Sequence, residues 1–185
     1  SLTLATDRQT NFAGYYIDAN GNERFYDNQV DHYDQDHYQL HLSQQLSKRT
    51  ALQLSGHYTY GRGYYEEYID EGSMEEHSIT PVTIDTTLIT ASDLIRRKWL
   101  DNDFYGFTGS VKHERTDWDI MLGGGLHIYE GDHFGEVIWS RYASDKEIRD
   151  RFYDNYGDKD EAHVFVKTNR KVKENWNIFV DLQLR

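Results

Sequence analysis

Apolar and polar side chains alternate with a period of two along much of this sequence, and this pattern predicts β-strands. In the last such segment, Trp176, Ile178 and Val180 share one parity, whereas Asn177 and Asp181 occupy the other. Successive side chains of a strand point to opposite faces, so each strand is expected to have one apolar and one polar face. Six segments carry the pattern, at about 37–46, 50–60, 103–112, 117–128, 161–168 and 174–184.

The connections between these segments are alternately short and long. Turns of a few residues follow the first, third and fifth segments, whereas long polar stretches, about 61–101 and 129–160, follow the second and the fourth. We predict an all-β, antiparallel up-and-down meander with short turns at one end and two long external loops at the other. A separate hairpin is predicted outside this sheet, around the turn signal Asn20-Gly21.

The apolar face of each predicted strand needs a cover. It carries about four or five large side chains, and full burial of each contributes roughly 1.5–3 kcal/mol, which is on the order of 10 kcal/mol per strand. A second sheet provides the cover in a soluble sandwich, and lipid provides it in a transmembrane barrel. The two architectures predict opposite burial for one set of side chains, namely Leu52, Leu54, Ile120, Leu122, Ile178 and Val180.

Two features favour the barrel. Short turns at one end and long loops at the other are typical of outer-membrane barrels. Tyr58, Tyr60 and Tyr105 lie beside the long stretches, and Trp118 and Trp176 lie beside the turns. Such aromatic side chains collect at both membrane interfaces. We therefore predict a part of a transmembrane β-barrel, for which six strands are too few to close.

Composition and charge exclude several classes of protein. The 185 residues have a formal net charge of −12, which argues against a nucleic-acid partner. The absence of Cys excludes disulfides, zinc–thiolate sites and a Cys nucleophile. No run of apolar residues is long enough for a transmembrane helix. A mean hydropathy of −0.85 does not decide between barrel and sandwich, because barrel strands alternate and their loops are polar.

Aromatic side chains of the external segments are the candidate ligand-binding residues. Tyr64, Tyr65 and Tyr68 are clustered in the first long stretch, and Tyr15 and Tyr16 lie near the N-terminus. Their rings could stack on a ligand. The alternative is that these tyrosines pack against one another.

No catalytic constellation is found, so we do not expect an enzyme. His57 and His127 fall on the polar parity among small residues and are expected either to face the lumen or to be structural. The clusters at 31–37 and 132–136 contain Asp, Glu and His, but a solvated loop explains them better than a metal site. No metal or cofactor is therefore assigned. Gly123-Gly124-Gly125 lies within a strand and is no phosphate-binding loop.

Several stretches resemble barrel segments of TonB-dependent outer-membrane receptors, in particular those of Bacteroides-type bacteria. The most distinctive is His57-Tyr-Thr-Tyr-Gly-Arg-Gly-Tyr-Tyr-Glu-Glu-Tyr68, and the likeness extends over nearly the whole chain. The other matching stretches are 22–30, 36–40, 94–106 and 123–139. The resemblance implies a 22-stranded barrel, an N-terminal plug and import driven through TonB. Neither plug, TonB-binding box nor C-terminal aromatic strand is found here, so we expect a piece of a longer protein.

The resemblance also implies a location and partners. The parent protein would lie in the outer membrane of a Gram-negative bacterium, in contact with lipid, and would engage the TonB complex through its missing N-terminal part. Its function would be active uptake of a small ligand, and a ferric siderophore or a related iron chelate is the expected one. The alternative hypothesis is a soluble β-sandwich that binds glycans through Tyr and Trp.

Overall fold

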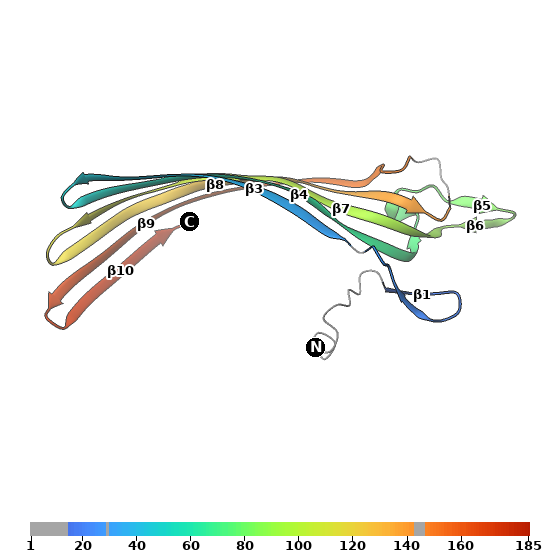
Figure 1. Ribbon diagram of the computed structural model, residues 1–185, viewed down its shortest axis with the longest axis horizontal. Helices are drawn as coiled ribbons and strands as arrows, with labels where there is room; N and C mark the ends of the chain where they lie inside the picture. The colour runs from blue at the N-terminus through green and yellow to red at the C-terminus, as the bar shows by residue number, and fades with distance from the viewer. Residues whose placement is uncertain (1–14, 29, 143–146) are drawn as a thin grey trace. The chain divides into compact units, whose positions relative to one another are not determined.

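A computed structural model describes residues 15–28, 30–142 and 147–185, and these residues are almost entirely strand. Six long strands form one antiparallel sheet in the order β10-β9-β8-β7-β4-β3 (Figure 1). Strands that follow one another along the chain are neighbours in the sheet, which confirms the all-β meander. Their bounds are β3 (Asp31–Ser47), β4 (Thr50–Ser73), β7 (Ala91–Glu114), β8 (Trp118–Ser140), β9 (Arg151–Lys173) and β10 (Trp176–Leu184).

The prediction of two long loops was wrong. Strands β4 and β7 extend far into the stretch 61–101, and β8 and β9 extend far into 129–160. A ladder of backbone hydrogen bonds does not require apolar side chains, and cross-strand aromatic and charged pairs also stabilise it. The alternation test detected only the apolar parts of these strands. The remaining excursion from β4 to β7 holds a single 3-10 turn (Glu75–His77) and the small hairpin β5 (Val82–Ile84) and β6 (Thr87–Ile89).

The hairpin expected near the N-terminus is confirmed. Strands β1 (Tyr15–Ile17) and β2 (Glu23–Phe25) form a two-stranded sheet of their own. Gly21 has a φ of 80°, which the turn requires and which glycine adopts without strain. The Asp18 carboxylate accepts hydrogen bonds from the backbone N–H groups of Asn20 and Asn22, both at 2.9 Å, and thereby fixes the turn.

The chain divides into two compact units, which are described separately. Unit 1 comprises residues 1–34, 62–101 and 132–156, and unit 2 comprises 35–61, 102–131 and 157–185. Strands β3, β4, β7, β8 and β9 each contribute residues to both units.

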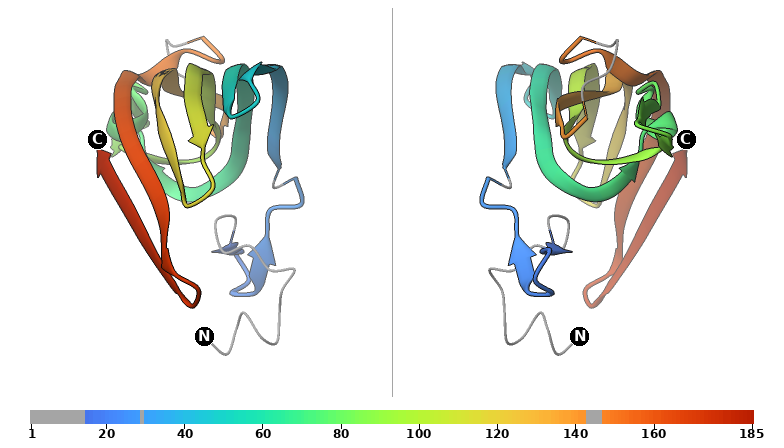
Figure 2. Two further views of the ribbon diagram at one scale, coloured as in Figure 1. Left: turned by 90° about the vertical axis from the view of Figure 1, so that its left-hand side faces the viewer. Right: turned by 90° about the vertical axis from the view of Figure 1, so that its right-hand side faces the viewer.

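Unit 2 is a single layer of sheet whose hairpin turns lie at one end (Figure 1). Seen from that end, its strands follow an arc (Figure 2). The large apolar side chains remain exposed, as at Leu40 (77%), Leu122 (58%) and Leu182 (66%). Ile120, Ile178 and Val180 are also exposed, and Leu52 and Leu54 are only half-buried. No second sheet of the described residues covers this face, so the burial expected for a sandwich is not found.

Unit 1 contains a small apolar core. Met74, Ile79 and Leu94 are buried, and Ile69 and Val137 pack against them together with residues of β5 and β6. The chain after β4 folds back because the backbone N–H of Ile79 donates to the carbonyl of Met74 at 2.8 Å. The segment between β4 and β7 thus covers part of the buried apolar cluster in the described part of unit 1.

The described residues contain no helix that is long and apolar enough to cross a membrane.

Gly63 sets the distance between β3 and β4 in unit 1, and its replacement is predicted to be costly. A Cβ atom at Gly63 would lie 2.1 Å from the carbonyl oxygen of His32 and 2.5 Å from the Cα of Tyr33. Because both obstacles are backbone atoms, we expect Gly63→Ala to separate the two strands and to destabilise unit 1 by about 1–3 kcal/mol. Denaturant unfolding measures this loss. Gly157→Ala is the control, since a Cβ there meets nothing within 4 Å; an equal effect of both substitutions would contradict the assignment.

Candidate ligand-binding site in unit 1

An aromatic row lies along one face of unit 1 and is formed by Tyr64, Trp99 and Phe134 from β4, β7 and β8. The ring centroids of Tyr64 and Trp99 are 4.6 Å apart, and those of Trp99 and Phe134 are 5.8 Å apart. The guanidinium groups of Arg97 and Arg151 lie over the rings of Tyr64 and Phe134, at 4.3 and 3.6 Å from the centroids. The row therefore ties three neighbouring strands together through ring and cation–π contacts.

The charges around the aromatic row are neutralised within it. Arg97 donates to Glu66 at 2.8 Å, and the indole N–H of Trp99 donates to Glu136 at 3.0 Å. Although burial alone raises the pKa of Glu66, hydrogen bonds from Tyr26, Arg97 and Asn28 lower it below its usual range. Tyr64 thus takes part in a network of charged and aromatic side chains.

Unit 1 also carries a hollow, which we call the tyrosine hollow. Its volume is about 640 Å³, and its lining includes Tyr64 and Trp99 of the aromatic row together with Tyr65, Tyr153, Lys98, His133 and Asp31. The ammonium group of Lys98 lies 5.7 Å from the centre of the Tyr65 ring. This arrangement joins phenol rings, a cation and an imidazole in one concave surface.

Gly135 makes room for two rings beside the tyrosine hollow. A Cβ atom at this position of β8 would lie 2.4 Å from atoms of both Phe152 and Tyr153. The absence of a side chain at Gly135 therefore lets the first residues of β9 place their rings against β8.

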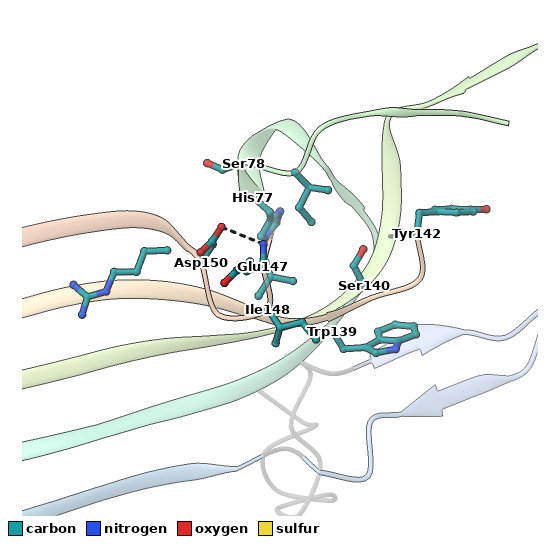
Figure 3. A pocket seen from close by; sticks show the side chains of 11 residues that line it. His77, Ser78, Trp139, Ser140, Tyr142, Glu147, Ile148 and Asp150 are labelled. Carbon is teal, nitrogen blue, oxygen red and sulfur yellow. Dashed lines mark hydrogen bonds between the residues drawn. The ribbon is translucent and has the colours of Figure 1, made fainter. Parts of the chain in front are cut away.

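A second, smaller cavity of about 230 Å³ lies at the far end of β8, and we call it the Trp139 pocket (Figure 3). Ile79, Val137 and Ile148 contribute its apolar walls, and Trp139 and Tyr142 add two aromatic rings. Val137 and Trp139 share the parity of His133, so alternation along β8 places them on the face that carries the tyrosine hollow.

Two carboxylates form part of the rim of the Trp139 pocket. The backbone N–H of Glu147 donates to the Asp150 carboxylate at 3.2 Å (Figure 3). Arg151 pairs with Asp154 at 2.7 Å. The aromatic platform with its acidic rim suits a neutral or cationic ligand better than an anion.

Buried His77 joins the Trp139 pocket to the core of unit 1. Its Nδ1 donates to the carbonyl of Ser73 at 2.8 Å, since a carbonyl oxygen can only accept. Its Nε2 is then left to accept from Arg96 at 3.0 Å, and Arg96 also pairs with buried Glu67. His77 is therefore neutral. Burial lowers the pKa of His77, and the neighbouring Arg96 lowers it further.

Two of the five tyrosines predicted as ligand contacts are brought together. Tyr64 and Tyr65 both line the tyrosine hollow, and Tyr64 also belongs to the aromatic row. Tyr68 contacts Tyr16, with ring centroids 4.7 Å apart, and burial raises the pKa of the Tyr68 phenol, as does its hydrogen bond with Asp93. Tyr15 packs against Phe25 within the N-terminal hairpin. Packing against other aromatic side chains thus accounts for Tyr68, Tyr15 and Tyr16.

Sequence reasoning missed most of the residues that line the two cavities. Tyr153, Lys98 and His133 carry no local motif, and they meet Tyr65 only through the pairing of four strands. Trp139 stood in a stretch that was expected to be loop. The one available signal was the alternation of aromatic and polar residues beyond the apolar segments, which marks the continued strands.

No metal site is preformed around the two clusters that the sequence raised. Among the described residues, no three His, Asp or Glu side chains are arranged to hold an ion together. His32 pairs with Asp34 at 3.0 Å, and both side chains are exposed. His57 and His127 lie in unit 2, where their ring nitrogens Nε2 and Nδ1 are 3.0 Å apart.

Comparison of the chain with protein-family models, with curated proteins and with solved structures gives no match.

The neutral state of His77 makes unit 1 sensitive to acid. The pKa of His77 is lower in the folded chain than the usual value of about 6.5. Neutral His77 therefore stabilises unit 1 fully at pH values above about 6.5. The contribution is lost as the pH falls through the depressed pKa, because protonated His77 no longer accepts from Arg96. We expect faster amide hydrogen exchange of residues 74–79 at pH 5 than at pH 7, after correction for intrinsic rates. His77→Gln should abolish this difference; its persistence in that variant would contradict the assignment.

Proposed function

We propose that this chain is a part of the wall of an outer-membrane β-barrel receptor that takes up a ligand with TonB coupling. The observation that carries the proposal is the uncovered apolar face of unit 2. Leu40, Leu122 and Leu182 are each more than half exposed, and a surface of this kind over several neighbouring strands needs lipid or another apolar partner. Lipid in contact with unit 2 is the simplest cover, because none of the described residues buries these leucines.

The edges of the sheet support the same proposal. Strands β3 and β10 are the two outermost strands, and each has a neighbour on one side only. Strand β3 is 17 residues long and all of them are exposed. Long unpaired edges are avoided in soluble proteins, and in a membrane the unpaired backbone groups must be satisfied by further strands. Neighbouring strands of the parent barrel would complete both edges.

The aromatic side chains of unit 2 suit two lipid interfaces. Tyr38 and Tyr58 stack with ring centroids 6.1 Å apart, and the hydroxyl of Tyr58 donates to Asp103 at 2.6 Å. At the turn end, Trp118 packs against His113 with centroids 5.7 Å apart. Rings that carry one polar edge are typical of both boundaries of a membrane-spanning strand.

Unit 1 would then provide the external, ligand-capturing part. The tyrosine hollow combines Tyr65 and Tyr153 with the ammonium group of Lys98. Aromatic faces together with a cation recognise flat, anionic aromatic groups, such as those of a ferric catecholate chelate. We therefore assign iron-chelate capture to the tyrosine hollow. The Trp139 pocket has two carboxylates, Glu147 and Asp150, against Asp31 alone in the tyrosine hollow, and is the less suitable of the two cavities for such an anion.

A pair of adjacent substitutions tests the lipid-facing assignment. Leu54 lies on the apolar parity of β4, and Gln53 lies on the opposite parity. Arg at a lipid-facing midplane position costs about 2–4 kcal/mol, so Leu54→Arg is expected to reduce insertion of the refolded full chain into vesicles. Gln53→Arg should insert like the parent. Vesicle flotation measures the inserted fraction; equal insertion of the two variants, or a stable monomer of the parent chain in detergent-free buffer, would refute the proposal.

A pair of tyrosine substitutions tests the tyrosine hollow. Tyr65→Ala removes one stacking surface and is expected to weaken binding of a ferric tris-catecholate probe by about tenfold, since a ring contact contributes roughly 0.5–1.5 kcal/mol. Tyr105→Ala is the control, because Tyr105 lies in unit 2, where its hydroxyl donates to Glu130 at 3.2 Å. Quenching of tryptophan fluorescence by the probe gives both affinities. Equal affinities of the two variants would remove the tyrosine hollow as the capture site and leave the barrel assignment untouched.

A further inference from the structure

Three histidines of unit 2 lie in a row on its polar face. His57 on β4 and His127 on β8 approach each other so that Nε2 of the first is 3.0 Å from Nδ1 of the second. The ring of His163 on β9 stacks on that of His127, with centroids 5.8 Å apart and an angle of 8° between the rings. The first two histidines come from strands that are not neighbours, because β7 lies between β4 and β8.

Gly106 on β7 allows the imidazoles of His57 and His127 to meet. A Cβ atom at Gly106 would lie 2.4 Å from Nδ1 of His127 and 2.9 Å from Nε2 of His57. Any other residue would place its side chain between the two nitrogens. The glycine therefore leaves a cradle beside a pair of nitrogen ligands, on the strand between them.

The third imidazole has an unused nitrogen. Nδ1 of His163 is buried and has no hydrogen-bond partner, and the nearest oxygen of Glu161 is 4.0 Å away. A buried polar atom without a partner is unfavourable and requires an explanation. Gly125 on β8 provides the space beside this ring, since a Cβ there would lie 2.9 Å from its Cε1.

Two phenylalanine rings flank the row. Phe104 contacts His57, with ring centroids 4.8 Å apart. Phe165 lies beside His163 at 6.5 Å. These rings place apolar surface at the two ends of the row.

We propose that the pair His57 and His127, over the cradle at Gly106, binds a divalent late first-row transition metal ion. Two nitrogen atoms 3.0 Å apart are spaced as adjacent ligands of an ion at about 2.0–2.1 Å from each. Imidazole selects Cu²⁺, Ni²⁺ or Zn²⁺ over Mg²⁺ and Ca²⁺. The described residues hold no preformed group of three ligands, so the two imidazoles hold the ion and water completes its coordination. The inference goes beyond ligand uptake and does not depend on it.

Titration of the refolded full chain in detergent with Cu²⁺ tests the site, with electron paramagnetic resonance as the readout. The expected spectrum shows coupling to two nitrogen nuclei. His127→Ala should weaken binding by at least about tenfold, since loss of even an indirect ligand partner has that effect. His57 and His127 are hydrogen-bonded to each other without an ion, so the metal would replace the shared proton. His41→Ala is the matched control, because His41 also lies in unit 2 but bonds the hydroxyl of Ser55 at 2.9 Å instead of a second imidazole.

Gly106→Ala is the decisive variant, since it keeps every histidine and fills only the cradle. It should weaken Cu²⁺ binding as strongly as His127→Ala does. Binding of the parent chain no tighter than about millimolar would overturn the proposal. Equal Cu²⁺ affinity of Gly106→Ala and the parent chain would also overturn the proposal. The ion would then be held by dispersed histidines or carboxylates and not by the pair at Gly106, and this conclusion is the same for a folded and an unfolded sheet.

Discussion

The backbone ladder of one antiparallel sheet holds this protein together, and side-chain burial contributes little. Among the described residues only Met74, Ile79, Leu94 and Phe134 are buried apolar side chains. A globular domain of this length would bury far more apolar surface. The described residues therefore leave most of their apolar side chains without the cover that the hydrophobic effect favours. The proposed lipid contact of unit 2 follows from this constraint.

The two units meet the constraint in different ways. Unit 2 leaves large apolar side chains such as Leu40, Leu122 and Leu182 exposed. Unit 1 replaces apolar packing by cross-strand networks, in which Arg97 joins Tyr64 to Glu66 and Arg96 joins Glu67 to His77. Such networks are compatible with water, and they leave concave aromatic surfaces on one face. A division into a lipid-facing part and a ligand-facing part is what the proposed receptor needs.

Glycine has a specific role at the places where strands or rings approach closely. Gly63 lets β3 lie against β4, Gly135 admits the rings of Phe152 and Tyr153, and Gly106 lets two histidines meet across a strand. In each case a Cβ atom would lie within about 2.9 Å of the neighbouring group. The sequence shows these glycines only as interruptions of an alternating pattern. Their role in allowing close approach can be recognised only when the opposing strand is known.

The sequence by itself determined the strands, their order as a meander and the apolar face, because a period of two along one strand is a local property. It also determined the N-terminal hairpin, through Asn20-Gly21. Only the tertiary structure decided that Tyr64 and Tyr65 line one hollow with Tyr153 and that His57 meets His127. Those contacts depend on the register between strands far apart in the chain, and a shift of one residue would turn every side chain to the other face. No local pattern encodes that register where polar and aromatic residues occupy both parities.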